Sequence, residues 1–321
     1  MKTHIQNLGE YQGNQLWIKR EDLIPFSFGG NKARKAKLFF REIDAGDYDV
    51  VVTYGSGSSN HCRIVANMAA ERGMRCVIIS AEETSKKTFN SELMKFFGAQ
   101  IRLCPVSKVH DTIEYTLEEL RELGFKPFFI PGGGHGYRGT AAYVECYDEI
   151  VDYEVKANLK FDYIFFASGT GTTHAGLVCG KLLHHDNCKI VGISIARKNP
   201  CGRQVVVDSV WEYLERESNE CGQQKKVKAG FSKLTFEEID KMVEFRDEYV
   251  LSGYGDHNDE IDKTIEQMMT KYGIPLDATY TGKAFWGMQK YLEKYKIADK
   301  RILFIHTGGT PLFFEYLRER E

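Results

Sequence analysis

The stretch DVVVTYGSGSSNHCRIVANMAAERGMRCVIIS, residues 49–80, contains the pattern that decides the fold. It begins with a β-branched run at 49–55, continues with an amphipathic segment at 59–73 and ends with a second apolar run at 75–80. A strand, a helix of about 10–15 residues and another strand are typical of a βαβ unit, whose strands lie parallel in one sheet. The stretch therefore predicts a parallel sheet with a helix packed on it.

The same alternation continues toward the end of the chain. Further strands are expected at 100–105, 126–131, 162–168, 189–196 and 301–307, and further helices at 91–98, 111–124 and 174–183. Near-continuous apolar runs such as YIFFA (163–167) are typical of strands that are buried on both faces of a sheet. The sequence therefore predicts an α/β fold with mainly parallel sheets flanked by helices.

The segment 205–260 departs from this pattern because it is charged and rich in lysine. It shows no strong strand signal before EYVLSGYG at 248–255. We expect helical packing and a surface excursion in this part of the chain.

Composition and charge exclude several classes of protein. The 321 residues carry a formal net charge of −2, with 42% hydrophobic and 27% charged residues. This balance argues against disorder and gives no electrostatic basis for binding nucleic acid or an anionic membrane surface. The N-terminal residues lack the apolar core of a secretory signal, and no run of about 18 apolar residues could span a bilayer. We therefore expect a soluble, cytoplasmic protein with no nucleic-acid or membrane partner.

The eight cysteines are scattered along the chain and form no C-x-x-C pair. Such pairs are typical of structural zinc sites and thiol redox centres, and a disulfide framework is typical of secreted proteins. We therefore expect neither a metal site nor disulfides.

The loop SGTGTT at 168–173 joins an expected strand to the helix at 174–183. Small residues let backbone amides approach an anion, the helix N-terminus adds partial positive charge, and the hydroxyl groups add hydrogen-bond donors. The loop lacks the Gly-Lys-Ser/Thr of a P-loop and the spacing of G-x-G-x-x-G, which disfavours a nicotinamide dinucleotide. It is either a phosphate-binding loop or a tight turn without a ligand.

A lysine, Lys32, follows the Gly29-Gly30 pair at an expected helix start. Lysine forms Schiff bases when burial or neighbouring charges lower its pKa, so Lys32 is a candidate for covalent chemistry. It could equally belong to the solvated polar face of a helix, shared with Arg34, Lys35 and Lys37. Spacing alone does not distinguish Lys32 from these neighbours.

Several motifs occur in an order that is familiar from one enzyme family. They are IKRED with GGNKARK (18–22 and 29–35), SNHxR (59–63), ASG with THAGL (167–169 and 173–177), YTGKA (280–284) and HTGG (306–309). In these motifs the chain resembles the family that contains D-cysteine desulfhydrase and 1-aminocyclopropane-1-carboxylate (ACC) deaminase.

The resemblance implies a pyridoxal 5'-phosphate enzyme of fold type II, in which two open, twisted, mainly parallel sheets are flanked by helices. It places the cofactor in a cleft between a large domain, 1–44 with 152–321, and a small α/β domain, 45–151. It also implies a homodimer and a small amino-acid substrate.

The resemblance also implies roles for individual residues. Lys32 matches the lysine that holds the cofactor as a Schiff base and then moves the Cα proton of the substrate. Asn60 matches a group that bonds the cofactor ring oxygen, and Tyr280 matches a tyrosine placed for acid/base work or for stacking against substrate. Ser59 and His61 match residues near the substrate carboxylate, and Ser59 also has the position of a helix N-cap. We expect Lys32, Tyr280 and Ser59 to be catalytic. The remaining cofactor-binding residues that the resemblance implies are Ser168, Gly169, Thr170, Gly171, Thr172, Thr173, Thr281 and Thr307.

Position 281 separates two activities within the family. ACC deaminase resembles this region but has a glutamate there, which keeps the ring nitrogen of the cofactor protonated and deepens its electron sink. A neutral Thr281 suits β-elimination, in which the leaving group carries the charge away. We therefore expect a carbon–sulfur lyase that converts D-cysteine into pyruvate, ammonia and hydrogen sulfide, with D-serine, β-chloro-D-alanine and cysteate open as substrates. The alternative is an ACC deaminase that gives 2-oxobutyrate and ammonia.

The chain also departs from the desulfhydrase pattern in places. It has Thr172-Thr173 where the pattern has Gly-Thr, Ser58 where the pattern has glutamine, and a charged stretch around 215–232 that fits poorly. Two further classes stay open, namely a phosphate-metabolite-binding protein that uses only the loop 168–173 and a non-catalytic relative that keeps the fold. In the first of these classes Lys32→Ala would leave ligand affinity unchanged.

Overall fold

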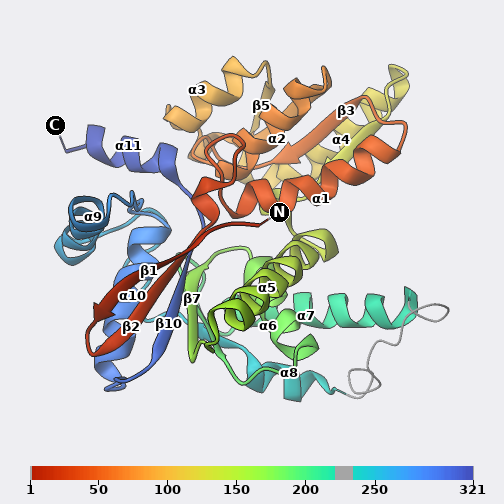
Figure 1. Ribbon diagram of the computed structural model, residues 1–321. Coiled ribbons are helices and arrows are strands. Elements are labelled where there is room, and N and C mark those ends of the chain that lie inside the picture. The colour runs from red at the N-terminus through yellow and green to blue at the C-terminus, as the bar shows by residue number, and fades with distance from the viewer. Residues whose placement is uncertain (1, 221–233, 321) are drawn as a thin grey trace.

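The computed structural model describes residues 2–220 and 234–320, which form two β-sheets flanked by helices (Figure 1). The larger sheet has six strands in the order β1-β2-β10-β7-β8-β9, and the smaller sheet has four in the order β5-β4-β3-β6. Paired strands run parallel except in the β1–β2 hairpin. This architecture confirms the predicted α/β fold with two mainly parallel sheets. The strands are β1 Ile5–Tyr11, β2 Asn14–Arg20, β3 Val50–Tyr54, β4 Arg75–Ala81, β5 Gln100–Cys104, β6 Pro127–Ile130, β7 Tyr163–Ser168, β8 Lys189–Ser194, β9 Glu244–Arg246 and β10 Arg301–His306.

Helices cover both faces of the larger sheet. Helices α5, α6 and α7 contribute to the core on one face, and α9 and α10 contribute to the core on the other. The α-helices of the described residues are α1 Asn31–Ala45, α2 Asn60–Glu71, α3 Phe89–Phe96, α4 Val109–Glu122, α5 Tyr137–Ala157, α6 Thr172–Leu183, α7 Cys201–Glu220, α8 Phe236–Met242, α9 Asp259–Tyr272, α10 Thr281–Lys294 and α11 Thr310–Arg318.

Strand β7 shows why its sequence is apolar without a break. Ile164 and Phe166 belong to the core on the α5–α6 face, whereas Phe165 and Ala167 belong to the core on the α10 face. Successive side chains of a strand point to opposite faces, so a strand covered on both sides is apolar at every position. The same reasoning accounts for the success of the strand predictions from residue 49 onward.

Those predictions are confirmed for β3, β4, β5, β6, β7, β8 and β10, and the predicted helices correspond to α2, α3, α4 and α6. Strands β1, β2 and β9 were not predicted. The hairpin turn between β1 and β2 lies at Gln12 and Gly13, which have positive φ values of 48° and 70°. Two successive positive φ values are typical of a type I′ hairpin turn, so the hairpin had a local signal in Gln-Gly.

The charged region 205–260 contains most of α7, all of α8, strand β9 and the start of α9. The strand ends before 248–255, where a strand signal was expected and where the chain instead forms turns. Residues 221–233 of this region, including most of the stretch that fits the family pattern poorly, lie outside the described residues.

The predicted division into a large domain, 1–44 with 152–321, and a small domain, 45–151, stays a prediction. Helix α1 contributes its apolar side chains to the core of the smaller sheet, and α5 contributes its apolar side chains to the core of the larger sheet. From this packing we propose that the small domain begins before α1 and ends before α5.

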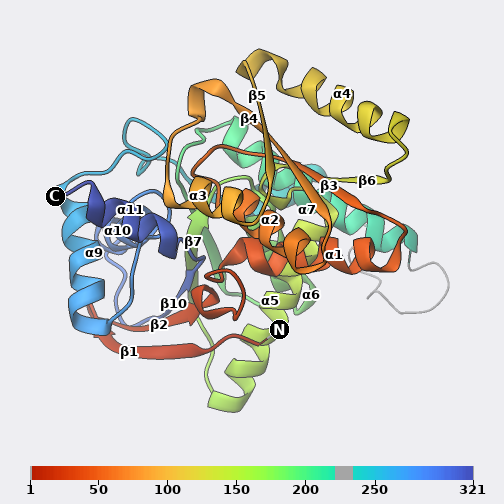
Figure 2. The same ribbon diagram turned by 90° about the horizontal axis from the view of Figure 1, so that it is seen from above.

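Helix α11, the last helix of the described residues, contacts helices of both sheets. Its Phe313 and Tyr316 belong to the core on the α9–α10 face of the larger sheet. It follows β10 and packs against α3, which belongs to the smaller sheet (Figure 2). Within residues 2–220 and 234–320, no helix has the length and apolar content needed to cross a membrane.

The carboxyl ends of strands from both sheets point to a common region. Glycine-containing turns follow β3, β6, β7 and β10, and residues of all four turns line one cavity. In open α/β sheets, ligands bind beyond the carboxyl ends of the strands, so the fold places this cavity where a ligand is expected.

Candidate active site

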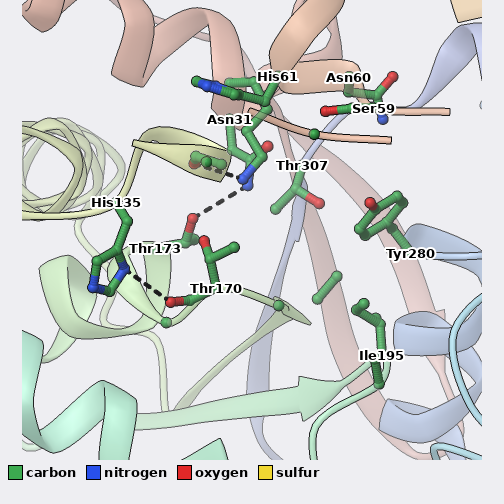
Figure 3. Close-up of a pocket in the computed structure, with 18 of the residues that line it drawn as sticks. Asn31, Ser59, Asn60, His61, His135, Thr170, Thr173, Ile195, Tyr280 and Thr307 are labelled. Atoms are coloured by element: carbon green, nitrogen blue, oxygen red, sulfur yellow. Dashed lines mark hydrogen bonds between the residues drawn. The ribbon is translucent and has the colours of Figure 1, made fainter. Parts of the chain in front are cut away.

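A cavity of about 600 Å³ collects most of the predicted site residues (Figure 3). Two predicted residues, Thr172 and Thr281, do not line it, because both are fully buried behind its wall. The predicted residues that line the cavity are Lys32, Ser59, Asn60, His61, Ser168, Gly169, Thr170, Gly171, Thr173, Tyr280 and Thr307.

Lys32 lies in the first turn of α1 and lines the cavity. Its Nζ donates a hydrogen bond of 2.9 Å to the carbonyl oxygen of Gly133. Burial lowers the pKa of the Lys32 amine from 10.5 to about 8. Helix α1 begins here because Gly29 and Gly30 have φ values of 59° and 94°, which glycine adopts without strain.

The neighbouring cations of α1 do not share this position. Arg34 is buried and forms ion pairs with Glu21 and Glu149, on the side away from the cavity. Lys35 is buried, and Lys37 is exposed. The structure thus separates Lys32 from its neighbours, which spacing in the sequence could not do.

The loop 168–173 runs from β7 into α6 and presents donors to the cavity. Ser168 Oγ is buried and has no hydrogen-bond partner among the described residues. Thr173 Oγ1 accepts from Asn31 Nδ2 at 3.2 Å, so its own hydroxyl hydrogen stays free to donate (Figure 3). At Gly171 φ is 100°, and an added Cβ would lie 2.9 Å from Val205 Cγ1, so the turn requires glycine.

The charge of the cavity wall agrees with an anionic ligand. Among the described residues, none of those lining the cavity is an aspartate or a glutamate. The N-terminus of α6 adds partial positive charge, and the buried, unpartnered Ser168 hydroxyl is a donor that a phosphate oxygen would satisfy. The residues present therefore fit a phosphate group at this loop.

Thr172 supports the loop from behind. Its Oγ1 accepts a hydrogen bond of 2.7 Å from Lys35 Nζ, which is itself fully buried. Burial, together with the nearby Lys32 charge, lowers the pKa of Lys35. The side chain of Thr172 is thus engaged away from the cavity.

The N-terminus of α2 forms the opposite wall. Ser59 is the N-cap, and its Oγ accepts from the backbone N–H of Cys62 at 3.2 Å. The backbone N–H groups of Asn60 and His61 belong to the first turn, where no preceding carbonyl of the helix can accept from them. Two amides and the Ser59 hydroxyl hydrogen therefore remain available for an anion.

The tautomer of His61 follows from its neighbour Thr53. The Thr53 hydroxyl donates its hydrogen to the carbonyl oxygen of Ile130 at 2.7 Å, so it can only accept from His61 Nε2 at 2.9 Å. The buried Nδ1 then carries a lone pair and has no partner among the described residues. Burial and the charges of Lys32 and Lys35 lower the pKa of His61, which keeps the ring neutral.

Tyr280 lies at the N-terminus of α10 and is paired with a residue that the sequence did not suggest. Its hydroxyl group and that of Tyr254 are 2.7 Å apart. The neighbouring Thr281 donates from Oγ1 to Asp277 Oδ2 at 2.7 Å, so its hydroxyl hydrogen points away from the cavity wall. Asp277 is fully buried, and burial raises the pKa of its carboxyl group.

The cavity-lining residues that the sequence did not suggest include His135, Tyr254 and Arg197. His135 belongs to the glycine-rich turn PGGGHG, and its Nδ1 lies 3.2 Å from the carbonyl oxygen of Thr170 (Figure 3). The sequence shows that this turn is rich in glycine, but nothing in it singles out the histidine. Tyr254 lies in SGYG, where an aromatic residue between glycines was a weak local signal, and Arg197 follows β8 without any signal.

Comparison with known proteins gives consistent matches over nearly the whole chain. The sequence model of the family described as "Pyridoxal-phosphate dependent enzyme" matches residues 2–308. D-cysteine desulfhydrase of Serratia proteamaculans is 31% identical over 322 residues, which cover 97% of this chain and 92% of that protein. D-cysteine desulfhydrase of Yersinia enterocolitica is 31% identical over 323 residues, with the same coverage. A crystal structure of an ACC deaminase homologue superposes with a TM-score of 0.82 at 30% identity and covers 99% of this chain and 93% of that one.

Proposed function

Because the chain belongs to the pyridoxal-phosphate dependent enzymes, in the family of D-cysteine desulfhydrase and ACC deaminase, we propose that it is a carbon–sulfur lyase for D-cysteine-like amino acids. With D-cysteine and water the products are pyruvate, ammonia and hydrogen sulfide. The observation that carries this proposal is the Lys32 amine, which lines a cavity without carboxylates that also contains the loop 168–173 and Tyr280.

The cofactor would be held from several sides. The loop 168–173 and the N-terminus of α6 would bind its phosphate, Lys32 would bind it covalently, and Asn60 would donate to its ring oxygen. Thr307 lines the cavity beside Lys32 and is a further cofactor contact in this proposal. When bound, the cofactor supplies an electron sink for the carbanion at the substrate Cα.

Lys32 would also move the substrate proton. An amine with a pKa of about 8 is partly neutral near pH 7–8, whereas an ordinary lysine is almost fully protonated there. With its amine free, Lys32 would accept the Cα proton of a substrate held in the cavity. Its placement in the cavity wall supports this role.

The N-terminus of α2 would bind the substrate carboxylate. The Ser59 hydroxyl and the free backbone amides of Asn60 and His61 are donors, and the helix end carries partial positive charge. The His61 ring has its bare Nδ1 available and cannot donate through that atom, so we assign the contact to the backbone of His61 rather than to its ring.

Tyr280 would protonate the departing sulfur. Burial and the neighbouring Tyr254 hold the pKa of Tyr280 well above its usual range, so its hydroxyl keeps its proton. A protonated phenol in the cavity wall is a general acid for a leaving thiolate.

Thr281 supports elimination rather than cyclopropane opening. Its side chain is neutral and is hydrogen-bonded to Asp277, so no carboxylate lines the cavity at this position. The similarity to an ACC deaminase homologue keeps the second activity as the alternative to be tested.

A substrate screen tests the proposal. Purified protein would be incubated with D- and L-cysteine, D-serine, cysteate and ACC, and 2-oxo acids and sulfide would be measured. Lys32→Ala serves as the blank and Lys37→Ala, which changes an exposed lysine of the same helix, as the matched control. Sulfide and pyruvate from D-cysteine are expected. 2-Oxobutyrate from ACC would support the alternative, and no 2-oxo acid from any substrate would overturn both. The predicted homodimer can be tested separately by light scattering.

A further inference from the structure

The first turn of helix α3 holds the loop that leads into the cavity. Thr88 Oγ1 donates to the carbonyl oxygen of Gly57 at 2.7 Å. Asn90 Nδ2 donates to the carbonyl oxygen of Ser58 at 2.8 Å and to Asn60 Oδ1 at 3.0 Å. Asn90 is fully buried and does not line the cavity, yet it contacts a residue that does.

These contacts fix the direction of two amide groups. A backbone carbonyl can only accept, so the Asn90 atom facing Ser58 must be its nitrogen. The same nitrogen faces Asn60, so the Asn60 atom in that contact must be the oxygen. The remaining end of the Asn60 amide is its Nδ2, a donor without a hydrogen-bond partner among the described residues, and Asn60 lies in the cavity wall (Figure 3).

We propose that Asn90 is a positioning residue for the cofactor site, which turns the Asn60 amide so that its N–H groups face the cavity. The cavity then offers a donor where an anionic ring oxygen of the cofactor would lie, and not the carbonyl oxygen that the opposite amide orientation would present. This inference rests on the proposed function only in taking the cavity as the cofactor site.

Helix α11 contacts the residue that precedes Asn90. Glu315 on α11 accepts from the backbone N–H of Phe89 at 2.8 Å, and the Arg318 guanidinium lies 4.8 Å from the centre of the Phe89 ring. Helix α11 thus braces the turn that carries Asn90. Asn90 Oδ1 is buried without a hydrogen-bond partner among the described residues, which costs folding free energy. The side chain is therefore better suited to orienting its neighbours than to stabilising the fold.

Asn90→Asp tests the proposal with little change of size. Aspartate has no N–H, so its buried carboxyl group can accept from Asn60 only if the Asn60 amide turns over and presents its oxygen to the cavity. Losing a hydrogen bond to a charged oxygen should raise the dissociation constant of pyridoxal phosphate at least about tenfold. The visible absorption band of the bound cofactor should also titrate at higher pH, because the anionic ring oxygen loses a donor. Neither readout depends on turnover, so failure of the lyase assignment leaves this test intact.

A second background shows whether Asn90 acts through Asn60. In Asn60→Ala protein the further change Asn90→Asp should leave the affinity and the titration of the band unchanged, since residues coupled by contact are not additive. Equal effects of Asn90→Asp in both backgrounds would overturn the proposal.

Thr88→Val is the matched control within the same turn. It removes the bond to Gly57 and the N-cap bond from Ser91 but leaves the Asn90–Asn60 contact, so it should lower the melting temperature without moving the absorption titration. If Asn90→Asp does not fold, Asn90→Ala takes its place, with an expected loss of affinity that Thr88→Val does not share. The same spectral change in Thr88→Val and Asn90→Ala would reduce Asn90 to general loop support and overturn the proposal.

Discussion

The hydroxyl oxygens of Tyr254 and Tyr280 lie 2.7 Å apart, and their rings meet edge to face at 5.8 Å between centroids. Tyr280 comes from the start of α10, whereas Tyr254 comes from the loop before α9, and Tyr254 also lies 3.5 Å from the Ser58 hydroxyl. The pair therefore joins the larger sheet to the loop that follows β3. One hydroxyl of the pair must donate to the other, so the Tyr280 hydrogen is free for the substrate only when Tyr254 is the donor.

Tyr280→Phe is expected to lower kcat by about 10²–10⁴, the usual contribution of a positioned general acid. The affinity for pyridoxal phosphate should stay within about twofold, because the residues assigned to the phosphate and ring oxygen are unchanged. Steady-state kinetics with D-cysteine and cofactor titration measure the two quantities. Tyr254→Phe keeps the Tyr280 hydroxyl and should reduce kcat less. Unchanged kcat in Tyr280→Phe would remove the tyrosine from the proposed mechanism.

The rate at which apoprotein takes up pyridoxal phosphate should increase with pH and level off above about pH 8. Only the neutral amine attacks an aldehyde, and burial lowers the pKa of Lys32 from 10.5 to about 8. The fraction of neutral Lys32 therefore rises as the pH rises through 8. Stopped-flow absorbance measures the rate. A rise centred near the ordinary lysine value of 10.5 would show that Lys32 is not desolvated.

Gly133→Ala should weaken cofactor binding by at least about tenfold. A Cβ at Gly133 would lie 2.6 Å from Thr170 Cγ2 and 3.3 Å from Lys32 Nζ, so both the phosphate loop and the lysine must shift. Gly124→Ala is the control. Gly124 also has a positive φ, 86° compared with 71° at Gly133, but no atom lies within 4 Å of the added carbon. Both variants share the backbone strain of about 1 kcal/mol, and only the first should lose affinity in a fluorescence titration. Equal affinities in the two variants would contradict the assigned site.

Arg34→Met should lower the free energy of unfolding by about 3–5 kcal/mol, because it leaves the buried Glu21 and partly buried Glu149 carboxylates with only one of their two cations, Lys19. Arg34 pairs with Glu21 and Glu149 and is 2% exposed. Arg41→Met removes an exposed ion pair with Glu145 and should change stability by about 0.5 kcal/mol or less. Urea unfolding compares the two variants. A loss in Arg34→Met no larger than that in Arg41→Met would show that the buried network is dispensable.

The same network predicts how stability depends on pH. Burial alone would raise the pKa of Glu21 and Glu149, but the charges of Arg34 and Lys19 outweigh it and hold both pKa values below 4.5. A carboxyl group with a lowered pKa in the folded state stabilises the protein above its unfolded pKa. This stabilisation is therefore complete above about pH 4.5 and is lost as the pH falls through the lowered folded values. The melting temperatures of wild type and Arg34→Met, measured between pH 3 and 7, test this dependence. The difference between the two melting temperatures should shrink as the pH falls.

Local patterns predicted the parts of the fold and site that depend on neighbouring residues in the chain. The apolar run of β7 predicts burial on both faces, and the loop 168–173 contains the small residues and hydroxyl groups of either an anion site or a tight turn, because each pattern is complete within a few residues. The pairing of Tyr254 with Tyr280 and the support of Asn60 by Asn90 depend on contacts between distant segments.

Thr281 shows that a contact can escape prediction from the sequence even when its partner is only four residues away. Its residue type alone makes the side chain neutral. Where its hydroxyl points depends on Asp277, four residues earlier, whose carboxylate also accepts from the backbone N–H groups of Tyr280 and Thr281. Nothing in the motif YTGKA indicated that partner.

Strand β10 lies between β2 and β7 in the larger sheet, and Arg301 pairs with Gln15. A chain growing on the ribosome at about 5–20 residues per second would complete β2 roughly 15–60 s before its partner strand exists. During that interval the inner edge of the N-terminal hairpin has unpaired backbone groups, which can pair with another chain. Chaperone demand during synthesis should therefore concentrate on the N-terminal hairpin, and folding of the finished chain should be slow because its decisive strand pairing is so distant in sequence.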